Sequence, residues 1–438
     1  MLEPDIEGRS WSDQARLDDD AYRRQISYLL EHSRFYRAKL GAENIRTAGD
    51  AGGLAEIDRL PFTEKDELRA TRTAEDPIGT HLAVPLDRLA RIFSTSGTTG
   101  TPSYVPLTAE DLTDWIRISS RSYSASGVKP GDRLISTYGA GPFVAGVTLD
   151  TFNALNLTHI PVGAGNTDRL LAAIALLKAD TVAMTPSYAL HVAEKAAERD
   201  IDLAASSVRR LLVAGEPGGG EPAIRAKLEA AWGADVTEAM GIGDIAVSLW
   251  GECPERHGMH FSGHGLVHVE LIDPLSGATV PIVEGAEGEL VYTHLRHRAA
   301  PLLRFRSRDH VRVVGETCAC GRASPRIRCI GRTDDMLIVR GVNVFPTALR
   351  EIVNEFRPLV SGVISVRPLH KGPRQNPPLR LVVELDGPIA NGGELAARIA
   401  VRLRDALVVT TTIELVPHGT LPRSSYKSHL VDWTEARA

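Results

Sequence analysis

The chain contains 438 residues, of which 43% are hydrophobic and 24% are charged. These fractions are typical of globular proteins and exclude fibrous proteins and wholesale disorder, while the length predicts at least two domains. The formal net charge is −5, from 50 Lys and Arg against 55 Asp and Glu, so we expect no nucleic-acid or membrane binding driven by overall charge.

The sequence carries few signs of export. Its first residues have neither a basic cluster nor an apolar run, which argues against a secretory signal. The longest aliphatic run, residues 170–177, is far shorter than the roughly 20 residues that span a bilayer. Four cysteines favour a reducing compartment over a disulfide scaffold. We therefore expect a cytoplasmic protein, either a monomer or a homodimer.

Hydrophobic spacing predicts secondary structure along the first three quarters of the chain. Residues 20–40 have the apolar period of a helix, and residues 89–92 read as a short strand. Residues 210–214 and 288–292 are β-branched runs typical of buried strands, with a second amphipathic helix between them at residues 221–232. Helices alternating with short buried strands predict an α/β architecture.

A domain boundary is expected near residue 331, after a segment rich in arginine. Beyond it the pattern predicts strands at residues 336–339 and 379–385 and helices at residues 347–356 and 394–407, with a proline at the first turn of the first helix. A stretch of this size and pattern predicts a small α+β domain. We therefore divide the chain into a large domain, a hinge and a small domain, at residues 1–331, 332–334 and 335–438.

The strongest local signal is a loop at residues 94–102, rich in glycine and hydroxyl side chains. Gly97 and Gly100 allow tight turns that point backbone N–H groups inward, and the hydroxyls add donors, which suits a polyanion such as a triphosphate. The loop lacks the Gly-Lys-Ser/Thr ending of a Walker A loop. By composition alone it can equally be a flexible surface loop.

This loop resembles the phosphate loop of adenylate-forming enzymes, the acyl-CoA synthetase superfamily. The resemblance runs along nearly the whole chain and is strongest to phenylacetate–CoA ligases. It implies the adenylate-forming fold, in which a large N-terminal domain of layered sheets and helices carries a small mobile α+β C-terminal domain. Seven motifs appear in the family's order, at residues 60–69, 94–102, 185–188, 214–217, 301–309, 331–346 and 421–427.

The resemblance implies an AMP-forming acid–thiol ligase that uses ATP, Mg²⁺ and coenzyme A. A small aromatic carboxylate would attack the α-phosphate of ATP, and a thiol would then attack the acyl-adenylate. Two mutually repelling anions must meet, so the site needs cations and aligned donors. Two alternatives stay open: an enzyme that loads the acid onto the pantetheine thiol of a carrier protein, and a non-catalytic sensor of nucleotides or acyl-adenylates. Retention of Lys427 argues against the sensor.

The resemblance also implies the nucleotide contacts. Asp309 would accept hydrogen bonds from the ribose hydroxyls, for which a carboxylate offers two acceptors, and Arg332 would reach ribose or phosphate. Taken alone, Asp309 reads as an ion-pair partner of Arg306 or Arg308. The complete expected set is Ser96, Gly97, Thr98, Thr99, Gly100, Gly215, Glu216, Pro217, Met240, Gly241, Asp309 and Arg332.

Several positions depart from the family pattern. Asp244 stands where a glutamate usually holds Mg²⁺, and its oxygens suit that hard ion. Thr101 replaces the usual loop lysine, Met240 replaces the aromatic residue that stacks on adenine, Gly243 replaces a hydroxyl, and Tyr426 replaces a glycine. These substitutions suggest a specialised, biosynthetic member. Without the resemblance, Met240 would simply be a core residue.

The small domain is expected to present two catalytic faces. Lys427 would bridge the attacking carboxylate and the α-phosphate, although an unaligned terminal lysine is ordinarily a solvated one. Asp334 would be the hinge about which the domain turns. Arg340 and Gly341 would line the coenzyme A tunnel, where a glycine permits close approach of the pantetheine arm.

Two glycine-rich segments are similar to those that line the family's acid pocket. Their small residues leave volume, and Tyr138 and Phe143 would supply flat apolar walls, which favours a compact aryl acid. The same residues also suit tight packing of strands against helices. The expected pocket residues are Tyr138, Gly139, Phe143, Gly163 and Ala214.

Cysteines and a histidine suggest a structural Zn²⁺ site. Three thiols and one imidazole would fill a tetrahedral shell. Cys-x-Cys spacing is a weak signal, however, and these residues can equally be ordinary cysteines that bind no metal. Some phenylacetate–CoA ligase-like proteins carry this constellation around zinc, and that resemblance favours His260 over His257. The expected ligands are Cys253, His260, Cys318 and Cys320, with Cys329 left free.

Overall fold

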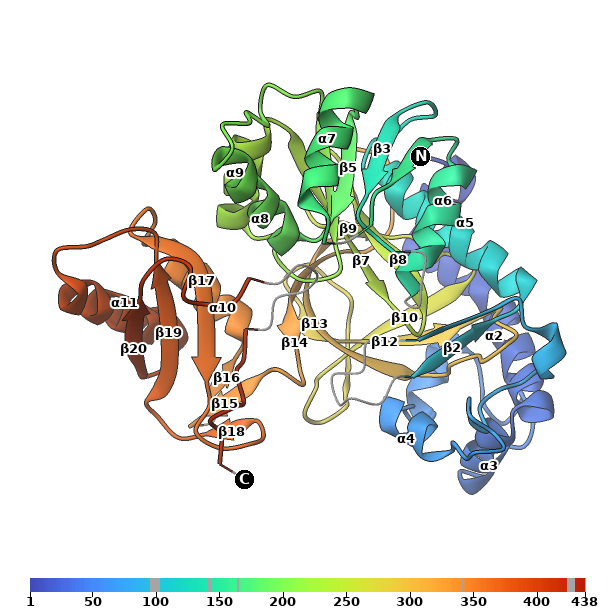
Figure 1. Ribbon diagram of the computed structural model, residues 1–438. Helices are drawn as coiled ribbons and strands as arrows, with labels where there is room; N and C mark the ends of the chain where they lie inside the picture. The colour runs from blue at the N-terminus through green and yellow to red at the C-terminus, as the bar shows by residue number, and fades with distance from the viewer. Residues whose placement is uncertain (95–102, 140–143, 164, 341, 424–429, 438) are drawn as a thin grey trace.

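The computed structural model of the protein describes residues 1–94, 103–139, 144–163, 165–340, 342–423 and 430–437 (Figure 1). A large α/β unit, blue to yellow in Figure 1, is followed by a smaller unit formed by the C-terminal residues, orange to red. This arrangement confirms the predicted fold class of a large layered α/β part with a small α+β part.

Helices of the larger unit lie around its main sheet. The longer ones are α2 (Trp11–His32), α3 (Arg34–Ala42), α5 (Ala109–Ala125), α6 (Val147–Ala154), α7 (Thr167–Leu177), α8 (Pro186–Ala197) and α9 (Pro222–Trp232). Shorter turns are α1 (Pro4–Glu7), α4 (Lys65–Ala70) and the 3-10 helices η1 (Leu54–Arg59), η2 (Leu86–Arg88) and η3 (Val144–Gly146).

The helix predicted over residues 20–40 is two helices, α2 and α3. The chain is extended at Ser33, whose hydroxyl accepts a hydrogen bond from the backbone N–H of Tyr36 at 3.3 Å and so caps α3. Both helices bury apolar side chains in one cluster, including Leu29 and Tyr36, which is why the sequence pattern continues across the break. A single helix was therefore wrong, although the predicted apolar face is present.

One sheet of twelve strands dominates the described part of the large unit, in the order β11-β10-β12-β13-β14-β9-β8-β7-β6-β5-β3-β4. Strands β4, β3, β5, β6 and β7 are parallel neighbours, and the rest of the sheet is antiparallel. A separate hairpin joins β1 (Arg91–Ser94) to β2 (Tyr104–Leu107). The parallel strands are β3 (Arg133–Ser136), β4 (Thr158–Pro161), β5 (Thr181–Met184), β6 (Arg210–Ala214) and β7 (Asp235–Ile242). The others are β8 (Ala246–Glu252), β9 (Met259–Phe261), β10 (Val267–Ile272), β11 (Thr279–Val280), β12 (Glu287–His294), β13 (Phe305–Gly315) and β14 (Arg326–Arg332).

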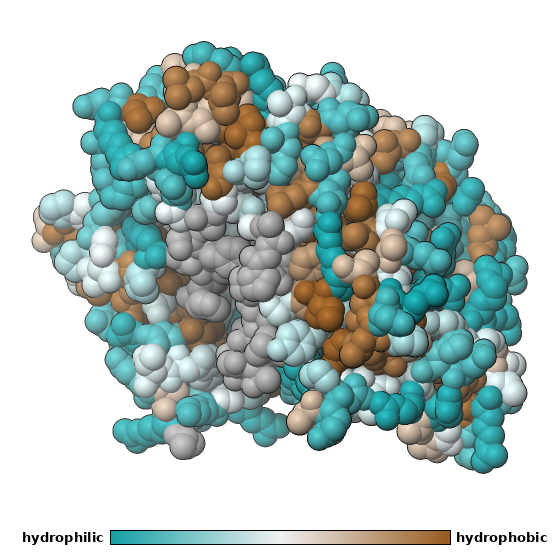
Figure 2. All heavy atoms as spheres, turned by 45° about the vertical axis from the view of Figure 1, so that its right-hand side comes forward, coloured by the Kyte–Doolittle hydropathy of each residue, from teal (hydrophilic) through white to brown (hydrophobic). Residues whose placement is uncertain are grey.

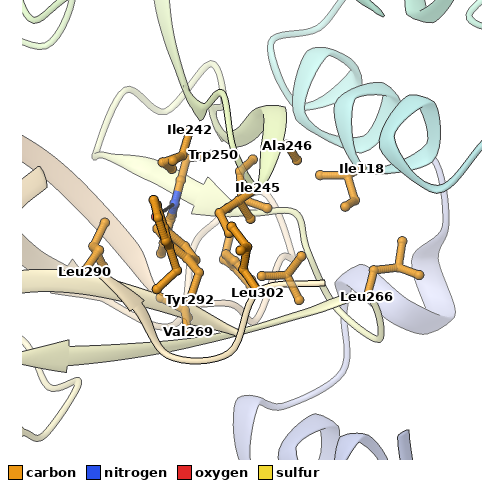
Figure 3. Packing of buried hydrophobic residues seen from close by; sticks show 14 of the residues in the cluster. Ile118, Ile242, Ile245, Ala246, Trp250, Leu266, Val269, Leu290, Tyr292 and Leu302 are labelled. Atoms are coloured by element: carbon orange, nitrogen blue, oxygen red, sulfur yellow. Dashed lines mark hydrogen bonds between the residues drawn. The ribbon is translucent and has the colours of Figure 1, made fainter. Parts of the chain in front are cut away.

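The two halves of the sheet have separate apolar cores. Helices α7, α8 and α9 pack on the parallel strands and bury Trp232 among aliphatic side chains. The antiparallel half packs around Trp250 and Tyr292, with Ile118 of α5 close by (Figure 3). The indole N–H of Trp250 donates to the Tyr292 hydroxyl at 2.7 Å, so these two buried polar groups satisfy each other.

The C-terminal unit has its own core, whose members lie between residues 337 and 433. Helices α10 (Pro346–Asn354) and α11 (Gly392–Leu407) and strand β19 (Leu379–Leu385) occur where the sequence predicts them. The described strands form two three-stranded sheets, β16-β15-β18 and β17-β19-β20. Their remaining members are β15 (Leu337–Val339), β16 (Val342–Val344), β17 (Val360–Arg367), β18 (Arg374–Gln375) and β20 (Thr411–Val416).

The surface is mostly polar. On the face drawn in Figure 2, hydrophobic residues lie in several separate groups among hydrophilic ones. Leu176 and Leu177 of α7 are among the exposed hydrophobic side chains, at 79% and 49%. In the described part of the chain, none of the helices combines the length and the apolar character needed to cross a bilayer.

Candidate active site

The structure brings three of the expected site residues together at the end of the large unit. Asp309 on β13 lies opposite Arg332 on the antiparallel neighbour β14, and the Arg332 guanidinium donates to the Asp309 carboxylate at 3.1 Å. A second guanidinium nitrogen lies 2.7 Å from the carboxylate of Asp334. Arg332 therefore connects the expected ribose-binding carboxylate with the expected hinge.

The alternative partners considered for Asp309 are wrong. Arg306 pairs with Glu289 at 2.8 Å, and Arg308 pairs with Glu64. The ion-pair partner of Asp309 comes instead from the neighbouring strand.

Burial and charge set the state of this cluster. Burial raises the pKa of Asp309, and the positive charge of Arg332 partly opposes that shift. Burial by itself lowers the pKa of Arg332. The carboxylates of Asp309 and Asp334 outweigh this effect and hold the pKa above its ordinary value. A carboxylate that is partly desolvated gains from further hydrogen-bond donors, and two ribose hydroxyls would supply them.

The expected Mg²⁺ ligand, Asp244, pairs with a residue to which the sequence assigned no role. The ammonium of Lys65, the first residue of α4, lies 2.7 Å from the Asp244 carboxylate. Lys65 belongs to the motif at residues 60–69, and its position inside a family motif could have identified it as a site residue. The pair lines a cavity together with Arg72, His81 and Ser103.

Two cationic side chains, those of Lys65 and Arg72, line this cavity together with the Asp244 carboxylate. Burial and the nearby Arg69 lower the pKa of Arg72, and burial lowers the pKa of His81 to about 4, so His81 is neutral near pH 7. Ser103 is the first described residue after the glycine-rich loop, and its hydroxyl accepts a hydrogen bond from Arg69 at 3.0 Å. The cavity therefore adjoins the end of the loop that is expected to hold phosphate.

The expected adenine segment follows β6. Gly215 has φ +96, a left-handed conformation that glycine adopts without strain, and the Glu216 carboxylate accepts a hydrogen bond from the Ser187 N–H at 2.8 Å, at the start of α8. Pro217 is half-buried. The segment is thus a turn that is hydrogen-bonded to the first turn of a helix. This geometry is compatible with a purely structural turn and also with a segment that contacts adenine.

Sequence reasoning missed a buried carboxyl pair behind this segment. Glu238 and Glu252 lie together, and Arg225 donates to Glu252 at 2.5 Å. Burial, with repulsion from Glu252, raises the pKa of Glu238 to about 7. A Cβ atom on Gly220 would lie 2.6 Å from a Glu238 oxygen, so the glycine run at residues 218–220 was the signal of this close approach.

Met240 and Gly241 lie on β7, the last parallel strand. Met240 is partly buried at the edge of the core cluster and lies opposite Trp250 on β8, while Ile242 is buried within that cluster. A Cβ atom at Gly241 would lie only 1.8 Å from the carbonyl oxygen of Val247, so a side chain cannot be accommodated there. The requirement for glycine comes from the backbone approach.

The expected acid-pocket residues gather at one edge of the sheet. Tyr138 and Gly139 follow β3, Gly163 follows β4 and Ala214 ends β6, and the carboxyl ends of parallel strands meet at the same edge. Tyr138 is only 7% exposed and its hydroxyl donates to the Met184 carbonyl at 3.3 Å. Its side chain therefore packs largely in a buried cluster.

Part of the expected site lies outside the described residues. Arg340 is described: it is exposed, follows β15 and has φ +50. The residues outside are Ser96, Gly97, Thr98, Thr99, Gly100, Phe143, Gly341 and Lys427.

The four expected zinc ligands converge although they come from distant parts of the chain. Their ligand atoms all lie within 4.8 Å of one another: Cys253, His260, Cys318 and Cys320. The sulfurs of Cys253 and Cys318 lie 3.7 Å apart, and Cys320 Sγ lies 3.5 Å from His260 Nε2. His257 is exposed and outside this group, so the geometry selects His260.

The histidine of this cluster is in the protonation state that a metal ligand requires. Burial lowers the pKa of His260 to about 3, which keeps the imidazole in its neutral, ligating form, and its Nδ1 atom is buried without a hydrogen-bond partner. Burial raises the pKa of Cys253 to about 12, and a bound cation would counter that shift. Three sulfurs and one nitrogen fit the tetrahedral preference of Zn²⁺.

Comparisons with known proteins show which family this chain resembles. A family described as "AMP-binding enzyme" matches residues 17–294, and one described as "AMP-binding enzyme C-terminal domain" matches residues 341–432. The phenylacetate-coenzyme A ligase of Thermus thermophilus is 34% identical over 446 residues, covering 97% of this chain and 97% of that protein. The phenylacetate-coenzyme A ligase of Escherichia coli is 30% identical over 438 residues, covering 98% and 96%.

Two solved structures of one ligase, in different states, match this chain to different degrees. A 2-hydroxyisobutyryl-CoA ligase in the postadenylation state, in complex with 2-HIB-AMP, has a TM-score of 0.89 at 25% identity, covering 98% of this chain and 91% of that one. The same ligase with 2-HIB-AMP and CoA in the thioesterification state has a TM-score of 0.72 at 26% identity, with the same coverage of 98% and 91%. The units of this chain are therefore arranged more as in the postadenylation structure.

Proposed function

The chain belongs to the AMP-binding enzyme family, and from this premise we propose that it is an AMP-forming ligase joining a small aromatic carboxylic acid to coenzyme A. The membership confirms the resemblance to adenylate-forming enzymes. The observation that carries the proposal is similarity to a phenylacetate-coenzyme A ligase across 97% of both chains. A non-catalytic sensor has no comparable support.

The reaction has two balanced steps. In the first, a carboxylate oxygen forms a bond to the α-phosphorus of ATP while the bond to the bridging oxygen breaks, giving an acyl-adenylate and pyrophosphate. In the second, the coenzyme A sulfur forms a bond to the acyl carbon, AMP leaves, and the thiol proton is released. Positive groups must face the phosphates in the first step, because both reactants are anions.

The nucleotide would be held by the cluster around Arg332. Asp309 accepts the ribose hydroxyls, and Arg332 balances the charge that this carboxylate brings. Glycines and hydroxyls of the loop at residues 94–102 donate to the phosphates, with Glu216, Pro217 and Met240 beside the adenine. The support is the contact of Arg332 with both Asp309 and Asp334.

Asp244 would hold Mg²⁺, which neutralises phosphate charge when it is bound. Lys65 lies against that carboxylate at 2.7 Å and offers a cation on the same side of the site. Thr101 replaces the usual loop lysine, so Lys65 supplies part of the positive charge that neutralises the phosphates. Cys253, His260, Cys318 and Cys320 would hold a structural Zn²⁺ away from the reacting atoms.

The remaining roles follow the division of the chain into residues 1–331, a hinge at 332–334 and residues 335–438. Lys427 would bridge the carboxylate and the α-phosphate during adenylation. Asp334 would then turn the small domain so that Arg340 and Gly341 face the coenzyme A tunnel. The ion pair from Asp334 to Arg332 supports a hinge that responds to the nucleotide site. No spanning helix is present in the described chain, and we propose a cytoplasmic location.

Acid-dependent exchange of pyrophosphate into ATP tests the first step. The panel should contain phenylacetate, benzoate, anthranilate and 2-hydroxyisobutyrate, with release of AMP then measured with and without coenzyme A. We expect exchange with an aromatic acid and AMP release only when coenzyme A is added. Exchange with 2-hydroxyisobutyrate alone would contradict the aromatic assignment, and exchange without turnover on coenzyme A would favour a carrier-protein thiol.

A further inference from the structure

A buried ion pair joins the C-terminal unit to the expected adenine segment. The Arg350 side chain, on α10, is 8% exposed and pairs with the carboxylate of Glu221, which is 13% exposed. One guanidinium nitrogen lies 3.2 Å from the second carboxylate oxygen, and another donates to the Pro217 carbonyl at 3.2 Å. Arg350 therefore contacts two residues, Pro217 and Glu221, of the segment between β6 and α9.

The surrounding contacts also join α10 and the residue before it to the larger unit. Glu221 is the N-cap residue of α9, yet its side chain makes no capping hydrogen bond and faces Arg350 instead. Closer to the hinge, Phe345 stacks on His310 with ring centres 4.7 Å apart. A turn of the C-terminal unit about residues 332–334 would displace α10 from the larger unit and separate Arg350 from Glu221.

Separating the pair has an energetic consequence. Two charges buried against each other lose their mutual attraction when they part, and the hydration that each then gains offsets part of that loss. A contact present in only one of two arrangements shifts the equilibrium toward that arrangement. The structure of this chain contains this contact. It has a TM-score of 0.89 to a postadenylation structure and of only 0.72 to a thioesterification structure of the same ligase.

We propose that Arg350 is a positioning residue for acyl-adenylate formation. Through its contacts with Glu221 and the Pro217 carbonyl, Arg350 positions the C-terminal unit against the expected adenine segment during the first step. These contacts must break before the thioester forms. Arg350 acts through this contact and touches none of the reacting atoms. The inference rests on the proposed ligase function.

The test separates the two half-reactions in Arg350→Gln and Glu221→Gln. We expect acid-dependent pyrophosphate exchange to fall by about tenfold or more in each, because one member of a buried charge pair is lost. Thiolysis of a supplied acyl-adenylate by coenzyme A should be unchanged or faster. Exchanging the charges, with Arg350→Glu and Glu221→Arg together, should recover part of the exchange rate.

Arg402→Gln is the matched control. Arg402 also lies in the C-terminal unit and pairs with Glu355 at 2.7 Å, but both side chains are nearly half exposed and the pair lies within one unit. Both half-reactions should keep their rates in this variant.

Other outcomes overturn the inference. Equal losses in both half-reactions in folded Arg350→Gln and Glu221→Gln would mean a merely structural contact, and unchanged exchange would mean no role. If Arg350→Gln does not fold, Glu221→Gln alone decides, because it leaves Arg350 its contact with Pro217. Absence of exchange in the unmodified protein with every acid would instead remove the proposed function, and this inference with it.

Discussion

Replacing Lys65 by methionine should impair adenylation far more than stability. The variant keeps most of the side chain's apolar length and removes the charge that lies 2.7 Å from Asp244. At an effective dielectric constant of about 20, two unit charges at that distance attract by about 6 kcal/mol. Solvent screens most of this attraction, since the Lys65 side chain is 30% exposed, so we expect a loss of only about 1 kcal/mol in the free energy of unfolding.

The loss in the rate of adenylation should be larger than the loss of stability. Lys65 faces the phosphates only when the nucleotide is bound, so its charge there affects the reaction and not the folding of the free protein. Loss of one group that stabilises developing charge typically costs about 100-fold in rate, or roughly 2.7 kcal/mol. Pyrophosphate exchange should therefore fall by about that factor, with partial recovery in Lys65→Arg. Lys39→Met is the control, since Lys39 pairs with Glu67 at 2.6 Å outside the cavity lining. A strongly destabilised but fully active Lys65→Met enzyme would refute this reasoning.

Three further predictions concern the nucleotide, the metal and pH. Asp309→Asn should raise the KM for ATP by about 10- to 100-fold, because hydrogen bonds to a charged group are worth about 1.5–3 kcal/mol; steady-state kinetics with an unchanged KM would contradict the ribose contact. Metal analysis of untagged protein should find about one zinc per chain, with loss of zinc and a lower Tm in Cys318→Ser; a stoichiometry near zero removes the site. Burial raises the pKa of Glu238 from 4.5 to about 7, so the folded state binds the extra proton and stability falls as pH rises through that window. Thermal unfolding of Glu238→Gln should lose this component, and an unchanged pH profile would count against it.

Much of this protein is determined locally and can be predicted from the sequence. The strand at residues 379–385 and the helix at residues 221–232 occur almost as expected, because propensity, proline placement and apolar spacing all act over a few residues. The motifs also specify the family, since loops that bind a nucleotide constrain several adjacent residue types at once. The zinc candidates were recognisable as residue types, but their spacing alone did not separate His257 from His260.

Only the tertiary structure decided which distant groups meet. Lys65 and Asp244 are 179 positions apart, and Arg350 and Glu221 are 129 apart, so neither pairing leaves a local pattern. Asp309 pairs with Arg332 through strand register, whereas sequence proximity suggested its neighbours. Ser33 breaks a helix whose apolar face continues across the break. Local sequence fixes the preferences of each segment, but ion pairs and buried carboxyls depend on how the sheet brings separate segments together.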